Sequence, residues 1–303
     1  MDTNELLDHL MGDATQGYTD VADFVEQLPV RLADVPNNPQ DRLIHGALLA
    51  GSQATAGIAG HQAAIRRLFP DTASNAVTAF CVSEDRGPHP RYIKTALAAD
   101  EQSITGKKMW GTMAPPSTTL YVAASVGQDK SGNNQLVMVA VDNPQPSIKQ
   151  IPLPPERQAG GLPICDLEFA QTPVARVYKD DAYENYIKPF RLIEDVFSTF
   201  ATQIALFRLG ARTGLDRTAR EDLLGLIMQG NSVVTSGMHT PAEILLLTSY
   251  LRGSQRHWGE LASAWHRSDP ALFKHWQPGR MILTVAARAR DKRRTNAWSD
   301  MEG

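Results

Sequence analysis

Three successive strands are predicted by one stretch near the middle of the chain, residues 103–142: SITGKKMWGTMAPPSTTLYVAASVGQDKSGNNQLVMVAVD. The three segments are 103–112, 119–126 and 134–142. They are rich in β-branched and aromatic residues, which favour strands. Lys130, Gly132 and Asn133 lie between the last two segments and are typical of a hairpin loop. The stretch therefore predicts consecutive strands with no helix between them.

The same pattern continues on both sides of this stretch. The flanking segments with strand character are 77–84, 147–153 and 165–174. Six short strands without intervening helices favour an antiparallel β-barrel or sandwich over a parallel nucleotide-binding sheet. Neither GxGxxG nor GxxxxGK[ST] occurs in the sequence, which excludes the usual dinucleotide-binding and P-loop motifs.

Helical patterns occupy both ends of the chain. Residues 45–69 are rich in Ala and Gly, and glycines that weaken a helix indicate close approach of neighbouring backbones. Thr240–Glu243 forms a capping box with proline at the first helical position. A later helical stretch is predicted to begin at Asp269–Pro270, and a last Arg-rich helix over 279–298.

One further helix shows a continuous apolar stripe, which indicates packing in a bundle. Its apolar positions are Ile193, Val196, Phe197, Phe200, Ile204 and Phe207. The sequence therefore predicts an α+β protein with three domains. These are a helical N-terminal domain over 1–75, a β middle domain over 76–178 and a C-terminal helical bundle over 179–303.

Composition excludes several classes of protein. The 303 residues carry a formal net charge of -3, which argues against a protein that grips nucleic-acid backbones. Two cysteines, Cys81 and Cys165, supply neither a disulfide framework nor a four-thiolate zinc site. No apolar stretch approaches the roughly 20 residues of a membrane span, and no secretory signal is visible. The expected location is the cytoplasm.

Other candidate sites are weaker. His257, His266 and His275 lack metal-ligand spacing with carboxylates on one helix face, so no metal site is predicted. Ser83 lacks the GxSxG elbow of hydrolases. The basic residues of 288–294 are better explained as cations at a helix end than as a phosphate-binding cluster.

Three stretches of the middle region, in this order, resemble the acyl-CoA dehydrogenase family. They are Phe80–Glu84, then Ile93–Ala96 followed by Thr105–Thr112, then Leu167–Val174. The first is similar to the family strand that ends in Thr/Ser-Glu-Pro. The second is similar to its passage Lys-Thr-Ala … Asn-Gly-Thr-Lys-Trp-Ile-Thr, and the third to its exit strand Phe-Asp-Asp-Val-x-Val-Pro. Their order and spacing make the resemblance fairly specific.

The resemblance implies a flavoprotein with FAD between the middle domain and the C-terminal bundle. In the family, the Trp-x-Thr pair packs on the isoalloxazine ring and hydrogen-bonds it, and a hydroxyl of the first strand also bonds the flavin. A planar, electron-poor ring suits an aromatic wall and hydroxyl donors at its edge. The cofactor-binding residues implied in this sequence are Phe80, Val82, Ser83, Trp110 and Thr112.

The implied reaction is α,β-dehydrogenation of an acyl-CoA thioester. A carboxylate removes the α-proton while the β-hydrogen leaves as hydride to the flavin. Arg191 aligns with a family arginine near the thioester and is predicted to bind substrate. The family's usual base follows a Gln-x-x-Gly-Gly-x-Gly stretch that has no counterpart here, and the position of the alternative base is Phe190. Glu194, one turn later on a similar face, is therefore the predicted catalytic base.

Other departures from the family keep two interpretations open. Gly87–Pro90 replaces the family's Gly-Ser-Asp, Asp85 replaces its proline, and the Arg-Phe-Gly signature is missing around Arg212–Gly214. The first interpretation is an FAD-dependent dehydrogenase that acts on an acyl-CoA-type molecule, with full or impaired activity. The second is a catalytically inactive, flavin-free homologue that acts as a structural or interaction subunit. Because family FAD sites straddle subunits, a homodimer or a homologous partner subunit is expected.

Overall fold

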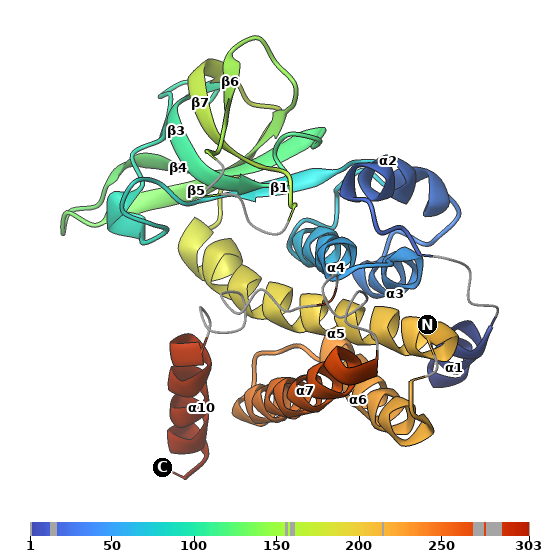
Figure 1. The fold of residues 1–303 in the computed structure, drawn as a ribbon. Helices are drawn as coiled ribbons and strands as arrows, with labels where there is room; N and C mark the ends of the chain where they lie inside the picture. The colour runs from blue at the N-terminus through green and yellow to red at the C-terminus, as the bar shows by residue number, and fades with distance from the viewer. Residues whose placement is uncertain are drawn as a thin grey trace. The chain divides into compact units, whose positions relative to one another are not determined.

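The computed structural model describes residues 2–12, 17–154, 157, 161–213, 215–268, 276 and 287–302 (Figure 1). The chain divides into two compact units. The helical unit comprises Met1–Ala64 and Ile193–Gly303, and the β unit comprises Ile65–Leu192.

One sheet organises the β unit. Its strands are β1 (Thr78–Cys81), β2 (Ala96–Leu97), β3 (Ser103–Thr112), β4 (Thr119–Gln128), β5 (Asn134–Asp142), β6 (Ile148–Pro152), β7 (Ile164–Pro173) and β8 (Arg176–Tyr178). Their order in the sheet is β6-β7-β3-β2-β4-β5-β8, and β1 pairs with β4. Most pairs are antiparallel, whereas β1 and β2 both run parallel to β4. A single 3₁₀ turn, η1 (Pro90–Tyr92), lies between β1 and β2.

All six predicted strands are confirmed, and β3 and β5 have the predicted bounds. The hairpin between β4 and β5 is also confirmed. Its Asp129 carboxylate accepts hydrogen bonds from the backbone N–H groups of Ser131 and Asn133, and Gly132 has φ +80°. The two strands that were not predicted, β2 and β8, have only 2 and 3 residues. Segments this short show no alternation of apolar and polar residues.

Aromatic side chains pack the start of the β unit against its sheet. Phe69 stacks on Tyr121 of β4 with ring centroids 3.8 Å apart, and on Tyr186 with centroids 4.9 Å apart. The Tyr121 hydroxyl also forms a hydrogen bond of 2.7 Å with the hydroxyl of Thr72. The ends of the unit are thereby joined through one aromatic cluster.

The helical unit is built from segments at both ends of the chain. Its helices are α1 (Thr3–Met11), α2 (Val21–Arg31), α3 (Pro39–Leu49), α4 (Gln53–Leu68), α5 (Lys188–Thr213), α6 (Arg217–Thr235), α7 (Pro241–Ser268) and α10 (Ala287–Glu302). The π-helical turn η3 (Tyr183–Ile187) precedes α5. The β unit includes the last residues of α4 and the first residues of α5. The predicted α5 stripe is buried: Ile193, Val196, Phe197, Phe200, Ile204 and Phe207.

The predicted capping box at the start of α7 is confirmed. The Glu243 carboxylate accepts the backbone N–H of Thr240 at 2.9 Å, and the Thr240 hydroxyl accepts the backbone N–H of Glu243. Hydrogen bonds from the backbone N–H groups of Thr240, His239 and Gly237 lower the pKa of Glu243 to about 2. At the other end of the unit, α10 covers most of the predicted helix over 279–298. The helical start predicted at Asp269–Pro270 lies outside the described residues.

Close backbone approach, which the glycines of 45–69 predict, occurs at Gly60 of α4. A Cβ atom added there would lie 2.5 Å from the Cα of Ser198 on α5, whereas one added at Gly57 would meet nothing within 4 Å. We therefore expect Gly60→Ala to lower the free energy of unfolding by about 2 kcal/mol, because the two helix backbones must separate. A shift of the urea-unfolding midpoint measures the effect.

Gly57→Ala is the matched control, since it lies in the same helix. Its expected effect has the opposite sign, a stabilisation of about 0.5–1 kcal/mol from the lower backbone entropy of the unfolded chain. Equal effects of the two substitutions would contradict the close approach of α4 and α5.

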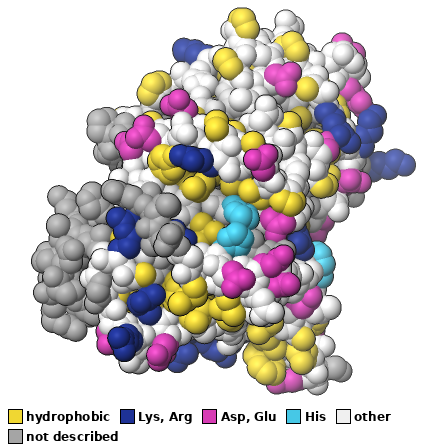
Figure 2. Space-filling view, turned by 90° about the vertical axis from the view of Figure 1, so that its right-hand side faces the viewer, with side chains coloured by type: hydrophobic (Ala, Val, Ile, Leu, Met, Phe, Trp, Pro, Cys, Tyr) yellow, Lys and Arg dark blue, Asp and Glu magenta, His cyan; other side chains and the backbone are white. Residues whose placement is uncertain are grey.

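Charges of both signs are interspersed on the face of the molecule shown in Figure 2. Among the helices that the structure describes, none is long and apolar enough to cross a membrane.

Candidate functional site

A β-bulge in β3 positions the tryptophan that the sequence singled out. The register between β3 and β7 shifts between Lys108 and Gly111, and Trp110 at the shift has φ 59°. In a regular strand the side chains of residues 108 and 110 lie on the same face of the sheet. A bulge inserts one extra residue, so the side chains that follow it lie on the opposite face. Lys108 is 0% exposed, whereas Trp110 is 44% exposed. The bulge therefore brings an aromatic ring to the surface of the sheet, and Trp110 is not a core residue.

Two side chains hold Trp110 in this position. The Asp166 carboxylate on β7 accepts the backbone N–H of Trp110 at 3.0 Å. The same carboxylate forms an ion pair of 3.2 Å with Arg157, whose guanidinium carbon lies 4.2 Å from the centroid of the Trp110 ring. Asp166 thus fixes both the tryptophan backbone and the cation over its ring.

The hydroxyl groups predicted to bind the cofactor lie on the same strand and beside it. The Ser83 carbonyl accepts the backbone N–H of Met109 at 2.8 Å, which places Ser83 next to the bulge. Thr112 ends β3, two residues after Trp110. Both side chains are half-buried, and neither hydroxyl forms a hydrogen bond with the residues that the structure describes. The strand that carries the exposed indole ring and the segment bonded to it therefore offer two hydroxyl donors to a ligand.

A buried ion pair supports this part of the sheet from within. The Lys108 ammonium donates to Oε1 of Glu84 at 2.7 Å and to the Val82 carbonyl at 3.3 Å. Glu84 also accepts the backbone N–H groups of Lys94 and Thr95 at 2.8 and 3.0 Å. The loop after β1 is thus tied to β3 on the side of the sheet opposite to Trp110.

The remaining predicted cofactor residues, Phe80 and Val82, take part in packing. Val82 is buried, and the Phe80 ring lies 4.2 Å from the ring of Phe190, centroid to centroid. Phe190, which the sequence resemblance predicts at the position of the family's alternative base, is itself buried. An apolar ring in this position has no proton to exchange, so Phe190 has no acid–base role.

The predicted base and the predicted substrate-binding arginine both lie near the start of α5. Arg191 is exposed. Glu194 belongs to the helical unit, where the Nδ1–H of His61 on α4 donates to its Oε1 at 2.6 Å. The His61 side chain is buried, and that of Glu194 is 38% exposed. A buried histidine therefore orients a carboxylate that still reaches solvent.

Comparison with known proteins identifies the fold. No protein-family model and no curated protein matches the sequence. Among solved structures, the chain is similar to butyryl-CoA dehydrogenase from Megasphaera elsdenii, with a TM-score of 0.61, 10% identity and 98% and 94% of the two chains covered. Acyl-CoA dehydrogenase from Geobacillus kaustophilus gives a TM-score of 0.58 at 11% identity, covering 97% and 93%. The chain has the acyl-CoA dehydrogenase fold.

A further similar structure, the apo form of PigA, covers 100% of both chains with a TM-score of 0.63 and 12% identity. These likenesses confirm the predicted α+β class and the order of helices, β domain and helical bundle within the acyl-CoA dehydrogenase fold. At 10–12% identity, the likenesses establish the fold and leave the site residues to be argued from their own geometry.

Within this fold, sequence reasoning missed four residues that shape the candidate site. They are His61, Lys108, Asp166 and Arg157. Asp166 lies 56 positions from Trp110 along the chain, and His61 lies 133 positions from Glu194. Only Lys108 carries a sequence signal, because a lysine at a core-facing strand position requires a buried acidic partner. Among the described residues, no group of three or more His, Cys, Asp or Glu side chains could hold a metal ion.

Proposed function

We propose that the protein is a flavin-dependent oxidoreductase that removes the α- and β-hydrogens of an acyl thioester, with FAD bound at Trp110. One observation carries the proposal: the bulge in β3 exposes the Trp110 ring on the strand that ends at Thr112 and is bonded to the Ser83 backbone, and the hydroxyls of Ser83 and Thr112 have no partner among the described residues. The acyl-CoA dehydrogenase fold of the chain agrees with this chemistry.

The chemistry of these side chains fits a flavin. An isoalloxazine ring is planar and electron-poor, so it stacks favourably on an indole ring, and its heteroatom edge accepts hydrogen bonds from hydroxyl groups. Trp110 would supply the aromatic wall, and Ser83 and Thr112 the hydroxyl donors. Arg157 adds a fixed positive charge beside Trp110, which favours a ring that gains negative charge on reduction.

The protein residues have separable roles in the proposed reaction. Bound FAD would supply the hydride acceptor that dehydrogenation of the β-carbon requires. The Glu194 carboxylate takes the α-proton, and His61 holds that carboxylate in one orientation through its Nδ1–H. Arg191, which is exposed, binds the acyl-CoA-type substrate.

A second candidate is a flavin-free homologue that serves as a structural or interaction subunit. The observation that favours it is Phe190, which fills the position of the family's alternative base with a buried ring packed on Phe80. Both candidate functions include assembly with a second copy of the chain or with a homologous partner chain, and both include a cytoplasmic location.

An absorption spectrum of the purified protein distinguishes the two candidates. The proposed function predicts flavin bands, and bleaching of these bands when an acyl-CoA is added without oxygen. A protein that remains colourless after incubation with FAD is the flavin-free homologue. If flavin bands are present but no acyl-CoA bleaches them, the protein binds the cofactor and an acyl thioester is not its substrate.

Trp110→Ala is expected to weaken FAD binding about 30-fold, because loss of the stacked ring removes about 2 kcal/mol. Titration of the flavin-free protein with FAD, followed by quenching of flavin fluorescence, measures the change. Trp298→Ala on α10 is the matched control, since that tryptophan is also 44% exposed. Equal affinities of the two variants would place the flavin away from Trp110.

A further inference from the structure

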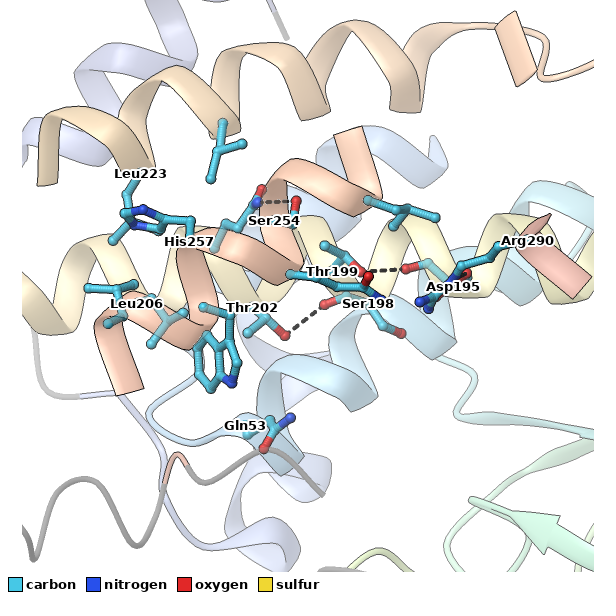
Figure 3. A pocket seen from close by; sticks show the side chains of 16 residues that line it. Gln53, Asp195, Ser198, Thr199, Thr202, Leu206, Leu223, Ser254, His257 and Arg290 are labelled. Atoms are coloured by element: carbon cyan, nitrogen blue, oxygen red, sulfur yellow. Dashed lines mark hydrogen bonds and ion pairs between the residues drawn. The ribbon is translucent and has the colours of Figure 1, made fainter. Parts of the chain in front are cut away.

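The helical unit contains a cavity that the proposed reaction does not use. It has a volume of about 100 Å³. Its walls are one face of α5 and one face of α7, with contributions from α4, α6 and α10 (Figure 3). This volume is of the same order as engineered cavities that bind a single aromatic ring.

The cavity has an apolar part and a polar part. Leucines from α5, α6 and α7 line the apolar part: Leu206, Leu223, Leu226, Leu251 and Leu261. Figure 3 shows Asp195 and Arg290 at the end opposite to Leu206 and Leu223, with Ser198 and Thr199 near them. A ligand that fills this space must therefore have both apolar and polar surface.

Hydroxyl groups on α5 present oxygen acceptors to the cavity. Thr199 donates its hydroxyl proton to the Asp195 carbonyl and Thr202 donates to the Ser198 carbonyl, each at 2.7 Å. With their protons donated to the backbone, these oxygens have lone pairs left to accept a hydrogen bond from a ligand.

Two polar groups on α7 have no partner among the residues that the structure describes. Nε2 of His257 and the indole N–H of Trp258 are buried and form no hydrogen bond with any of these residues. Both residues line the cavity, and His257 is only 9% exposed. A buried donor or acceptor without a partner is costly, and such groups in native proteins are often satisfied by a ligand or by ordered water.

The cavity carries no uncompensated charge. The Arg290 guanidinium and the Asp195 carboxylate form an ion pair, with Nε 2.7 Å from Oδ2. Burial lowers the pKa of His257, so its imidazole is neutral at pH 7. An anion or a cation would enter without a counter-ion, which disfavours charged ligands.

We propose that this cavity is a binding site for an uncharged molecule about the size of one substituted ring, carrying a single hydroxyl or amide group. The apolar body of the molecule contacts the leucines. Its oxygen accepts the Trp258 N–H, and its own N–H or O–H meets an acceptor among His257 and the threonine hydroxyls. The site is independent of the proposed flavin chemistry.

Calorimetric titration of the full-length protein with four probes tests the proposal. Benzyl alcohol and benzamide carry the required polar group, toluene lacks it, and benzoate adds a charge. For a ligand of about eight non-hydrogen atoms, we expect Kd values of about 1 mM or tighter for the first two probes. Binding of toluene and benzoate should be at least about 5-fold weaker, from the lost hydrogen bond or the buried charge. Equal binding of all four probes, or no saturable binding, overturns the proposal.

Two variants locate the binding in the cavity. Trp258→Phe keeps an aromatic ring but removes the N–H, so the Kd for benzamide should rise about 5-fold. Because the change also removes a buried donor without a partner, the thermal midpoint of the free protein should not fall. Leu226→Trp fills the cavity and should abolish binding, whereas Leu246→Trp at an exposed position of α7 should leave it unchanged. If neither Trp258→Phe nor Leu226→Trp alters the Kd, the probe binds elsewhere.

Discussion

Glu84→Gln is expected to destabilise the protein by about 3–5 kcal/mol, because the change leaves a buried ammonium without its counter-ion. Lys108 is 0% exposed, and among the described residues its Nζ donates hydrogen bonds to Glu84 Oε1 at 2.7 Å and to the Val82 carbonyl at 3.3 Å. The glutamine keeps the shape of the side chain but not its charge. Urea unfolding followed by fluorescence measures the loss.

The neighbouring lysine on β3 provides a matched control. Lys107 pairs with Glu168 of β7, but its side chain is 72% exposed. Because an exposed pair in water contributes little, Glu168→Gln should change the free energy of unfolding by less than about 1 kcal/mol. Similar losses for Glu84→Gln and Glu168→Gln would contradict the burial of the Glu84–Lys108 pair.

Replacing both members of the pair provides a second check. The double substitution Glu84→Gln with Lys108→Met removes the buried charges together, so it should recover much of the stability that Glu84→Gln alone loses. No recovery would mean that Glu84 acts through its hydrogen bonds to the backbone of Lys94 and Thr95 rather than through the charge.

The pH dependence of stability follows from the same pair. Burial alone would raise the pKa of Glu84, but the Lys108 charge and the hydrogen bonds from Lys108, Thr95 and Lys94 outweigh it and lower the pKa below 4.5. A carboxyl group with a lowered pKa in the folded state stabilises the protein above its unfolded pKa, and this stability is lost as the pH falls through the folded pKa. We expect Glu84→Gln to flatten the loss of stability below pH 4.5.

Strand and helix positions were predictable because their signals are local. Enrichment in β-branched and aromatic residues marks β4 and β5 whatever strands they pair with, and the capping box at Thr240 marks the start of α7 by itself. The parallel pairing of β1 with β4, by contrast, has no local signal in the sequence. It depends on contacts between segments about 40 residues apart, which no local pattern encodes.

The site was predictable only in part, because a motif identifies residues but not the contacts that they make with distant segments. Trp110 and Ser83 could be singled out through a family motif, but plain alternation would place Trp110 on the same face as Lys108. The bulge that separates them needs an unpaired residue opposite Asp166, and that depends on the register between β3 and β7. The contact between His61 and Glu194 likewise requires α4 and α5 to be packed together.

Glu194→Gln is expected to lower the rate of flavin bleaching by an acyl-CoA by about 10²–10⁴-fold, the usual contribution of a general base. The amide cannot take the α-proton, yet its oxygen can still accept the His61 Nδ1–H, so the helices should remain packed. Stopped-flow absorbance without oxygen gives the rate. The flavin spectrum of the variant should be unchanged, because Trp110 and its neighbours are intact.

Glu184→Gln is the control: Glu184 is an exposed glutamate whose ion pair among the described residues is with Lys188, so the change should leave the rate unaltered. His61→Gln should slow bleaching less than Glu194→Gln does, because it disturbs the orientation of the base and not the base itself. A Glu194→Gln variant that bleaches within about 3-fold of the unaltered protein would show that another group removes the proton. Because Phe190 has no proton to exchange, that group would then have to be a residue other than Phe190 and Glu194, in this chain or in a partner subunit.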